Sequence, residues 1–195
     1  SPLYPILVRG LMSISGLSYD IAAPGLSLVA GAAAAVVMFA LVSATAGRVA
    51  GAATFSLTGT FMAAPVMPLA YTESLALLLV CSGLLLLRRR SYLLASVAIL
   101  LLSITRPIVL AFVPVVFAHG MSLRHPEPGN PSLRSDRRAV WALAGVCVAG
   151  SVLWPVTVAL ATGHPFAWFE SESAWVTAPT AIPGLGWFRF FQAAG

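Results

Sequence analysis

The chain has 195 residues, of which 59% are hydrophobic and only 9% are charged, and its mean hydropathy is +0.93. These values exclude an ordinary soluble domain, in which about a quarter of the residues carry charge, and they indicate an integral membrane protein. The formal net charge of +5 comes from arginines confined to short connections, so nucleic acid is not an expected partner.

Two long apolar runs predict helices that cross a lipid bilayer. Residues 22–46 and 139–162 contain no ionised side chain, and about 20 such residues span the hydrocarbon core. Shorter apolar segments are expected to form short or re-entrant helices. In chain order they are residues 1–20, 50–66, 72–87, 91–105 and 107–119. The expected fold is therefore an all-α membrane bundle of about six hydrophobic helices.

The connections predict the orientation. Residues 120–138 are rich in Pro, Gly, Ser and charge, which predicts a solvated loop. Together with Arg48 and residues 88–90 this loop holds eight of the 11 arginines, and arginine accumulates on the cytoplasmic side of membranes. The aromatic and weakly acidic residues 163–195 are therefore expected outside. We expect residues 1–195 to form one partial transmembrane domain, an internal piece of a multi-pass protein of a bacterial cytoplasmic membrane.

No cofactor is expected. Cys81 and Cys147 fall inside predicted helices and are interpreted as buried small apolar residues. His, Cys, Asp and Glu do not occur at metal-ligand spacing. The sequence nevertheless leaves a role for a divalent metal open.

Arg106 is the most conspicuous ionisable residue, because apolar residues precede and follow its Thr-Arg-Pro segment. Its guanidinium needs a partner, and a lipid phosphate would accept two hydrogen bonds from it. Alternatively, Arg106 satisfies the last carbonyl groups of helix 91–105 and extends to lipid headgroups.

Other candidates lie on the predicted outer side. Glu73 follows Thr72, so its carboxylate either complements the positive end of helix 72–87 or accepts hydrogen bonds from sugar hydroxyls, with Tyr71 packed beside it. Trp168 and Trp175 fit either an interfacial aromatic belt or a surface on which sugars stack. Glu170 and Glu172 are two residues apart, so they share a face only if the chain is extended there, and they are otherwise interpreted as a pair of solvated loop acids.

Four ordered segments resemble one family. Residues 1–9, SPLYPILVR, resemble the FPLYPLLVR segment of PIG-V-type, GPI mannosyltransferase-like enzymes, which are membrane proteins of the GT-C superfamily. Residues 70–75, AYTESL, are similar to the family's PYTESLF, and residues 102–107, LSITRP, to its ASATRP. Residues 163–169, GHPFAWF, followed by Ala174 and Trp175, resemble GDPLAFL…AW.

The resemblance implies a GT-C-like bundle that transfers mannose, or a related sugar, from a polyprenyl-phosphate-sugar donor to a lipid-linked or protein acceptor. It implies inversion at the sugar and a site on the extracytoplasmic face. Arg106 is then expected to hold the donor phosphate. The acceptor and sugar pocket is expected to include Tyr71, Glu73, Trp168, Glu170 and Trp175.

The same resemblance implies where the catalytic base lies. The family carries a Trp-Asp motif before its Pro-Leu-Tyr-Pro segment, so the base is expected upstream of Ser1, and the family has further helices after the part that ends at Gly195. A sugar hydroxyl needs a general base at neutral pH. The 195-residue piece by itself is therefore expected to be inactive.

Two other classes of protein remain open. A transporter or flippase component also combines short, broken helices with a buried charge, although transporters commonly show paired repeats and the Thr-Arg-Pro break has no counterpart here. A noncatalytic membrane scaffold predicts that changes at Arg106 or Glu73 alter assembly without a sugar phenotype.

Overall fold

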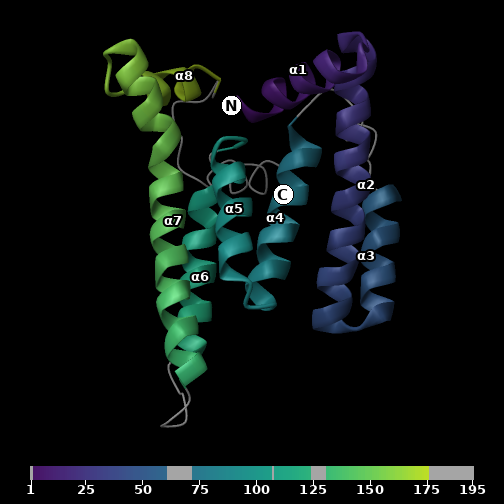
Figure 1. Ribbon diagram of the computed structural model, residues 1–195, viewed down its shortest axis with the longest axis vertical. Coiled ribbons are helices and arrows are strands. Elements are labelled where there is room, and N and C mark those ends of the chain that lie inside the picture. Colours follow the sequence, from purple (N-terminus) through teal and green to yellow (C-terminus); the bar gives the residue numbers. More distant parts are fainter. Residues whose placement is uncertain (1, 61–71, 107, 124–130, 176–195) are drawn as a thin grey trace, which may run out of the picture. The chain divides into compact units, whose positions relative to one another are not determined.

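The computed structural model describes residues 2–60, 72–106, 108–123 and 131–175, and for residues 131–135 and 172–175 it describes the backbone alone. The described part is helical, as predicted (Figure 1). The helices are α1 (Leu3–Ser15), α2 (Tyr19–Ala46), α3 (Arg48–Thr60), α4 (Glu73–Arg88), α5 (Tyr92–Ser103), the 3-10 turn η2 (Val109–Ala111), α6 (Phe112–Ser122), α7 (Pro131–Thr162) and α8 (Ala167–Trp175).

Two helical segments are long and apolar enough to cross a membrane. They are Tyr19–Ala46, with 28 residues and a mean hydropathy of 2.3, and Asp136–Thr162, with 27 residues and a mean hydropathy of 2.0. At a rise of about 1.5 Å per residue, each segment is about 40 Å long. These are the two spans that the apolar runs 22–46 and 139–162 predict.

The structure differs from the sequence prediction between residues 120 and 138. Helix α6 continues to Ser122, and α7 begins at Pro131, so both ends of the predicted loop are helical and residues 124–130 lie outside the described part. Proline fits the first turn of a helix, because the amide hydrogen that it lacks would have no partner there. The chain divides into two compact units, Ser1–Leu153 and Trp154–Gly195.

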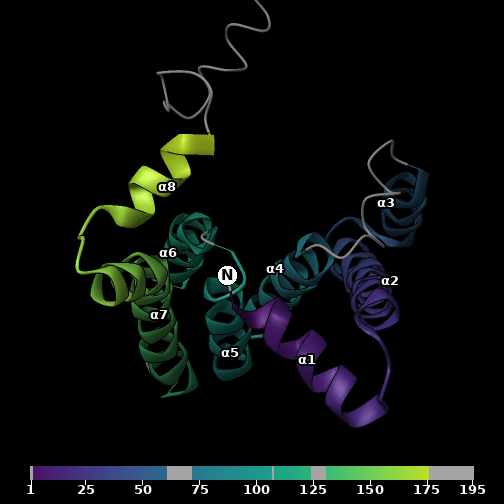
Figure 2. The ribbon, with the colours of Figure 1, turned by 90° about the horizontal axis from the view of Figure 1, so that it is seen from above.

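The first unit is built on α2, which packs against α3 and α4, while α4 packs against α5 (Figures 1 and 2). The turn after α2 is made at Gly47, whose φ of 91° is favourable only for glycine. A Cβ atom on Gly51 would lie 2.1 Å from Ser43 Oγ and 3.1 Å from the carbonyl oxygen of Phe39, so the absence of a side chain at residue 51 favours the close approach of α2 and α3. Small residues commonly allow such close contacts between membrane helices.

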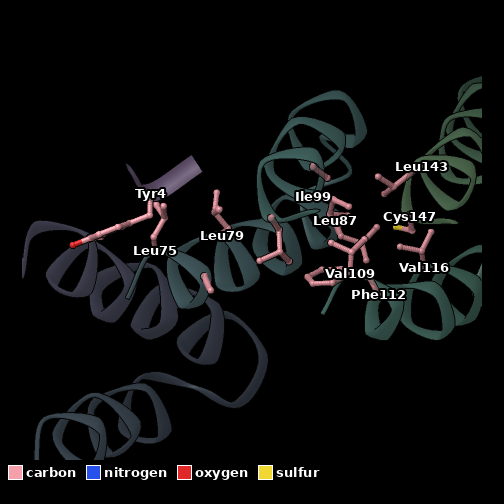
Figure 3. Close-up of a cluster of buried hydrophobic side chains, with 14 of the residues drawn as sticks. Tyr4, Leu75, Leu79, Leu87, Ile99, Val109, Phe112, Val116, Leu143 and Cys147 are labelled. Carbon is pink, nitrogen blue, oxygen red and sulfur yellow. The ribbon is translucent and has the colours of Figure 1, made fainter. Parts of the chain in front are cut away.

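A second packed region lies where α4, α5, α6 and α7 meet within the first unit (Figure 3). The side chains of Ile99, Val116 and Leu143 are almost completely buried there. Cys81 and Cys147 are also buried and are free thiols, as predicted. Phe112 fills the space beside Gly83, where a Cβ atom would lie 3.2 Å from its ring.

Helix α1 is attached to the same end of the first unit as the start of α4 and the end of α5. The hydroxyl of Tyr4 donates to the backbone oxygen of Ala23 (2.8 Å) and lies 2.7 Å from Ser27 Oγ, both in α2. The amide of Leu3 donates to the carbonyl of Ile104, just after α5 (3.4 Å). These bonds place α1 across the bundle rather than parallel to α2 (Figures 1 and 2).

Candidate functional site

The first unit brings Glu73 and Arg106 together. Arg106 Nη2 donates to Glu73 Oε1, and Arg106 Nε donates to the hydroxyl of Thr72 (3.2 Å). The two charged residues are separated by 33 positions in the sequence. The side chain of Arg106 is 40% exposed and that of Glu73 is 37% exposed, so both side chains are partly accessible.

The end of α5 presents Arg106 to the start of α4. Helix α5 closes with a tight turn, in which the amides of Thr105 and Arg106 both donate to the carbonyl of Leu102 (2.9 and 2.8 Å). The buried hydroxyl of Thr105 donates back to Leu101 (2.6 Å). The residue after Arg106 is a proline, which disfavours helical conformation at Arg106. The helix therefore stops here, and Arg106 lies in the connection beside α4.

Glu73 is the first residue of α4, where a carboxylate interacts favourably with the positive end of the helix dipole. Its second oxygen, Oε2, is buried and has no hydrogen-bond partner within the described residues. Thr72 occupies the N-cap position without a side-chain capping bond, and its hydroxyl accepts from Arg106 instead. The site thus contains a carboxylate oxygen with unused acceptor capacity beside a guanidinium with further N–H donors.

Within the described residues, the charged partner of Arg106 is the carboxylate of Glu73, which the sequence assigns to a separate role. The signal for this pairing is the antiparallel arrangement of α4 and α5, which places the first residue of one helix beside the end of the other. Each charge is also isolated in apolar sequence. The pairing of Glu73 with Arg106 can therefore be predicted only when the antiparallel arrangement of α4 and α5 is combined with the isolation of the two charges.

The remaining predicted pocket residues fall outside the described side chains or in the second unit. Tyr71 is outside the described residues, and Trp175 ends α8 with an undescribed side chain. Trp168 and Glu170 lie on α8 in the second unit. The ring of Trp168 meets the ring of Phe169 edge to face, with centroids 4.7 Å apart. A common pocket for these residues and Glu73 therefore stays a prediction.

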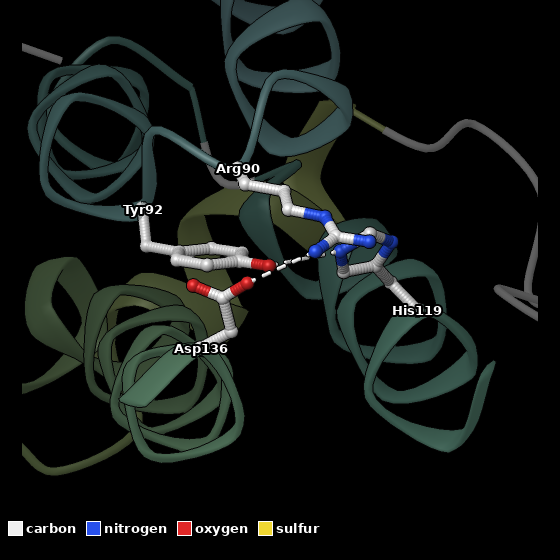
Figure 4. Close-up of polar contacts among 4 residues, drawn as sticks. All are labelled: Arg90, Tyr92, His119 and Asp136. Atoms are coloured by element: carbon white, nitrogen blue, oxygen red, sulfur yellow. Dashed lines mark hydrogen bonds and ion pairs between the residues drawn. The ribbon is translucent and has the colours of Figure 1, made fainter. Parts of the chain in front are cut away.

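A second polar cluster, which the sequence analysis missed, lies at the opposite end of the α4–α5 pair (Figure 4). Arg90 Nη1 forms an ion pair with Asp136 Oδ2 (3.2 Å), and the hydroxyl of Tyr92 lies 3.4 Å from His119 Nε2. These contacts join the α4–α5 turn to α5, α6 and the start of the apolar part of α7. Several arginines lie close to Asp136 in the sequence, so the sequence alone does not indicate that its ion-pair partner is Arg90.

Metal ligands do not cluster in the described part of the chain: no group of three or more His, Cys, Asp or Glu side chains there is placed to hold an ion. Comparisons of the whole chain with protein-family models, curated proteins and solved structures find no match.

Proposed function

We propose that the chain belongs to an integral, multi-pass membrane protein. The packing of α2 supports this proposal, because its buried side chains are small, as at Ala23, Ala30 and Ala34, whereas its large apolar side chains Leu28 and Val36 are exposed. A soluble helix buries its large apolar side chains. Exposed apolar surface on a membrane-length helix instead favours contact with lipid.

We also propose that the Arg90–Asp136 end of the bundle faces the cytoplasm of a bacterial cell. Arg88 Nη2 donates to the carbonyl of Ala44 near the end of α2, so the ends of α2 and α4 lie together there. The arginines on these and neighbouring helix ends are Arg48, Arg88, Arg89, Arg90, Arg137 and Arg138. Their concentration fits the cytoplasmic preference of arginine and orients Glu73 and Arg106 toward the outside.

The function that we propose is glycosyl transfer from a polyprenyl-phosphate-sugar donor, mannose or a related sugar, to a lipid-linked or protein acceptor. The observation that carries it is the contact between Glu73 and Arg106. These residues belong to the two internal segments, Tyr-Thr-Glu-Ser and Thr-Arg-Pro, that resemble the PIG-V-type family. Segments that are distant in the sequence thus supply complementary charges at one site.

In this proposal Arg106 binds the donor phosphate. One terminal nitrogen bonds to Glu73 and Nε bonds to Thr72, while the remaining N–H groups of the planar guanidinium are available for two phosphate oxygens. Stabilising the leaving phosphate helps because negative charge develops there as the sugar–oxygen bond breaks. No metal or other cofactor is part of the proposal.

Glu73 contributes through its buried, unpaired Oε2, which accepts a hydrogen bond from a sugar or acceptor hydroxyl. Tyr71, Trp168, Glu170 and Trp175 are proposed as further parts of the acceptor and sugar pocket. The acceptor oxygen bonds to the anomeric carbon, the bond from that carbon to the phosphate oxygen breaks, and the acceptor proton passes to a general base. Glu73 is not proposed as that base, because its carboxylate is paired with Arg106.

The test is deletion of the gene that encodes this chain, followed by complementation. Detergent-permeabilised membranes are supplied with radiolabelled polyprenyl-phosphate-mannose, and labelled lipid and protein products are counted. We expect deletion to remove a labelled product and the wild-type gene to restore it. Arg106→Ala is expected to lower the transfer rate by about 100-fold or more. Arg89→Ala is the matched control, because Arg89 is exposed and lies at the end of α4 opposite Glu73. A gene that carries Arg89→Ala is expected to restore the labelled product in the deletion strain.

The same membranes separate the proposal from its alternatives. A transporter or flippase leaves transfer intact once detergent gives the donor access to both faces. A scaffold leaves transfer intact and changes only the assembly of partner proteins. Normal transfer with Arg106→Ala would therefore refute the role of Arg106, and an unchanged product pattern in the deletion strain would refute the transferase assignment.

A further inference from the structure

A cavity of about 420 Å³ lies along α1, and neither Glu73 nor Arg106 is among the residues that line it. Its walls come from α1 and from the first residue of α2. The lining residues are Tyr4, Pro5, Ile6, Val8, Arg9, Met12 and Tyr19. The cavity therefore combines one cation and two phenols with a wall that is otherwise mostly apolar.

Arg9 is the charged group of this cavity, and it is exposed. The ion pairs found within the described residues join Arg90 to Asp136 and Arg106 to Glu73, so neither includes Arg9. Asp20 directly follows Tyr19 in the sequence but lies outside ion-pair distance of Arg9. None of the N–H donors of this guanidinium is therefore used in an ion pair with the described residues, and they can bind an external anion.

The two tyrosines of the cavity play different roles. The hydroxyl of Tyr4 bonds to Ala23 and Ser27, so Tyr4 contributes its ring to the wall. Tyr19 is 54% exposed, and its hydroxyl has no hydrogen bond to the described part of the protein. Because Tyr19 and Arg9 line the same cavity, the phenol hydroxyl is a second donor that an anion in the cavity could use.

The surroundings of the cavity favour an anion with a hydrocarbon chain. Ile6, a wall residue, is 61% exposed, and Ile14 farther along α1 is 89% exposed. A helix that carries apolar side chains on its outer face and lies across the end of a membrane-length helix fits the boundary between headgroups and acyl chains. Arg106, in contrast, already has a carboxylate partner.

We propose that this α1 cavity binds a lipid phosphate, with the phosphate on Arg9 and Tyr19 and the first part of the hydrocarbon chain against Ile6 and Met12. The site is separate from Glu73 and Arg106 and does not depend on the proposed transfer reaction. The positive charge of Arg9 favours a phosphate group, and the apolar wall of the cavity favours a ligand that carries a hydrocarbon chain.

The test measures binding to the whole purified chain in mild detergent by native mass spectrometry. The probe is farnesyl phosphate, and the comparison ligands are farnesol, which lacks the phosphate, and inorganic phosphate, which lacks the chain. We expect farnesyl phosphate to bind saturably and more tightly than either comparison ligand. Equal affinity for farnesol or for inorganic phosphate would overturn the proposal.

Two variants locate the site. Arg9→Gln is expected to weaken farnesyl phosphate binding about tenfold or more, because charge-assisted hydrogen bonds to the phosphate are lost. Met12→Trp fills the cavity without altering its charge and is expected to weaken binding as well. Circular dichroism and the unfolding temperature verify that both variants are folded. Wild-type affinity in both folded variants would overturn the assignment.

Arg48→Gln is the matched control for general attraction to positive charge, since Arg48 is an exposed arginine at the start of α3. An equal loss of affinity in Arg48→Gln and Arg9→Gln would show nonspecific attraction and overturn the proposal. Arg106→Gln distinguishes this site from the proposed donor site. If Arg106→Gln loses farnesyl phosphate binding and Arg9→Gln keeps it, the proposed site in the α1 cavity is refuted and the proposed transferase function is not. If the deletion strain shows no change in labelled sugar products, the transferase function is refuted and the α1 site is not.

Discussion

Arg106, just after α5, forms an ion pair with Glu73, the first residue of α4, and thereby closes one end of the α4–α5 pair. Both side chains are partly exposed, so solvent screens their attraction, and exposed ion pairs contribute only about 0–1 kcal/mol to stability. The pair is therefore expected to contribute little to the free energy of unfolding.

A double-mutant cycle with Glu73→Gln and Arg106→Gln measures the coupling between the two side chains. We expect a coupling energy in unfolding of about 1 kcal/mol or less, because the pair is half-exposed. Thermal unfolding in mild detergent gives the four stabilities that the cycle requires. A coupling of about 3 kcal/mol or more would contradict this expectation and identify the pair as a structural clamp.

Arg90 is expected to tolerate glycine better than alanine. Its φ of 57° lies in the left-handed region, where a Cβ atom is unfavourable. Arg90→Gly and Arg90→Ala both lose the ion pair with Asp136, but only glycine relieves the backbone strain. We therefore expect Arg90→Gly to be more stable than Arg90→Ala by about 1 kcal/mol in detergent unfolding experiments.

The neighbouring residue is the control for this comparison. Arg89 has a φ of −77°, so it carries no such strain. Arg89→Gly is expected to be less stable than Arg89→Ala, because glycine has more conformational freedom to lose on folding. The same order of stability at both positions would show that the left-handed backbone at Arg90 has no energetic consequence.

Gly51 is expected to be required for the close approach of α2 and α3. An added Cβ atom would meet Ser43 Oγ at 2.1 Å and the carbonyl of Phe39 at 3.1 Å. Gly51→Ala is therefore expected to lower the free energy of unfolding by about 1–3 kcal/mol. Chemical or thermal unfolding of the purified variant measures this loss.

Gly59 provides the matched substitution in the same helix, since no atom lies within 4 Å of its added Cβ. Gly59→Ala is expected to be neutral or to stabilise α3 by up to about 1 kcal/mol, because alanine favours helix. Equal destabilisation by both alanines would refute the specific contact. Combining Gly51→Ala with Ser43→Gly is expected to restore part of the lost stability.

Tyr4→Phe is expected to loosen α1. The substitution removes the hydroxyl that donates to Ala23 and contacts Ser27, at a cost of about 1 kcal/mol. Amide hydrogen exchange in α1 should accelerate while exchange in α4 stays slow. Tyr19→Phe, at an exposed tyrosine, should change stability by less than about 0.5 kcal/mol. Unchanged exchange in Tyr4→Phe would show that α1 is held by other contacts.

Much of the helical framework was predictable from local patterns. The runs 22–46 and 139–162 coincide closely with the apolar parts of α2 and α7, because uninterrupted apolar sequence of that length has few other stable conformations. Prediction failed at residues 131–138, where polar composition suggested a loop although a proline starts a helix. It also missed the pairing of Arg90 with Asp136, since nothing local identifies a partner 46 residues away.

The sequence by itself determined that the chain is helical and apolar, where the two long helices lie and which few residues are charged. Hydropathy and helix length are local properties, so composition suffices to predict them. Only the tertiary structure decided that Arg106 meets Glu73, that Tyr4 anchors α1 to α2 and that Arg9 lines a cavity. Those relationships depend on how helices distant in the sequence pack, and packing is decided by the shape and volume of all the contacting side chains together.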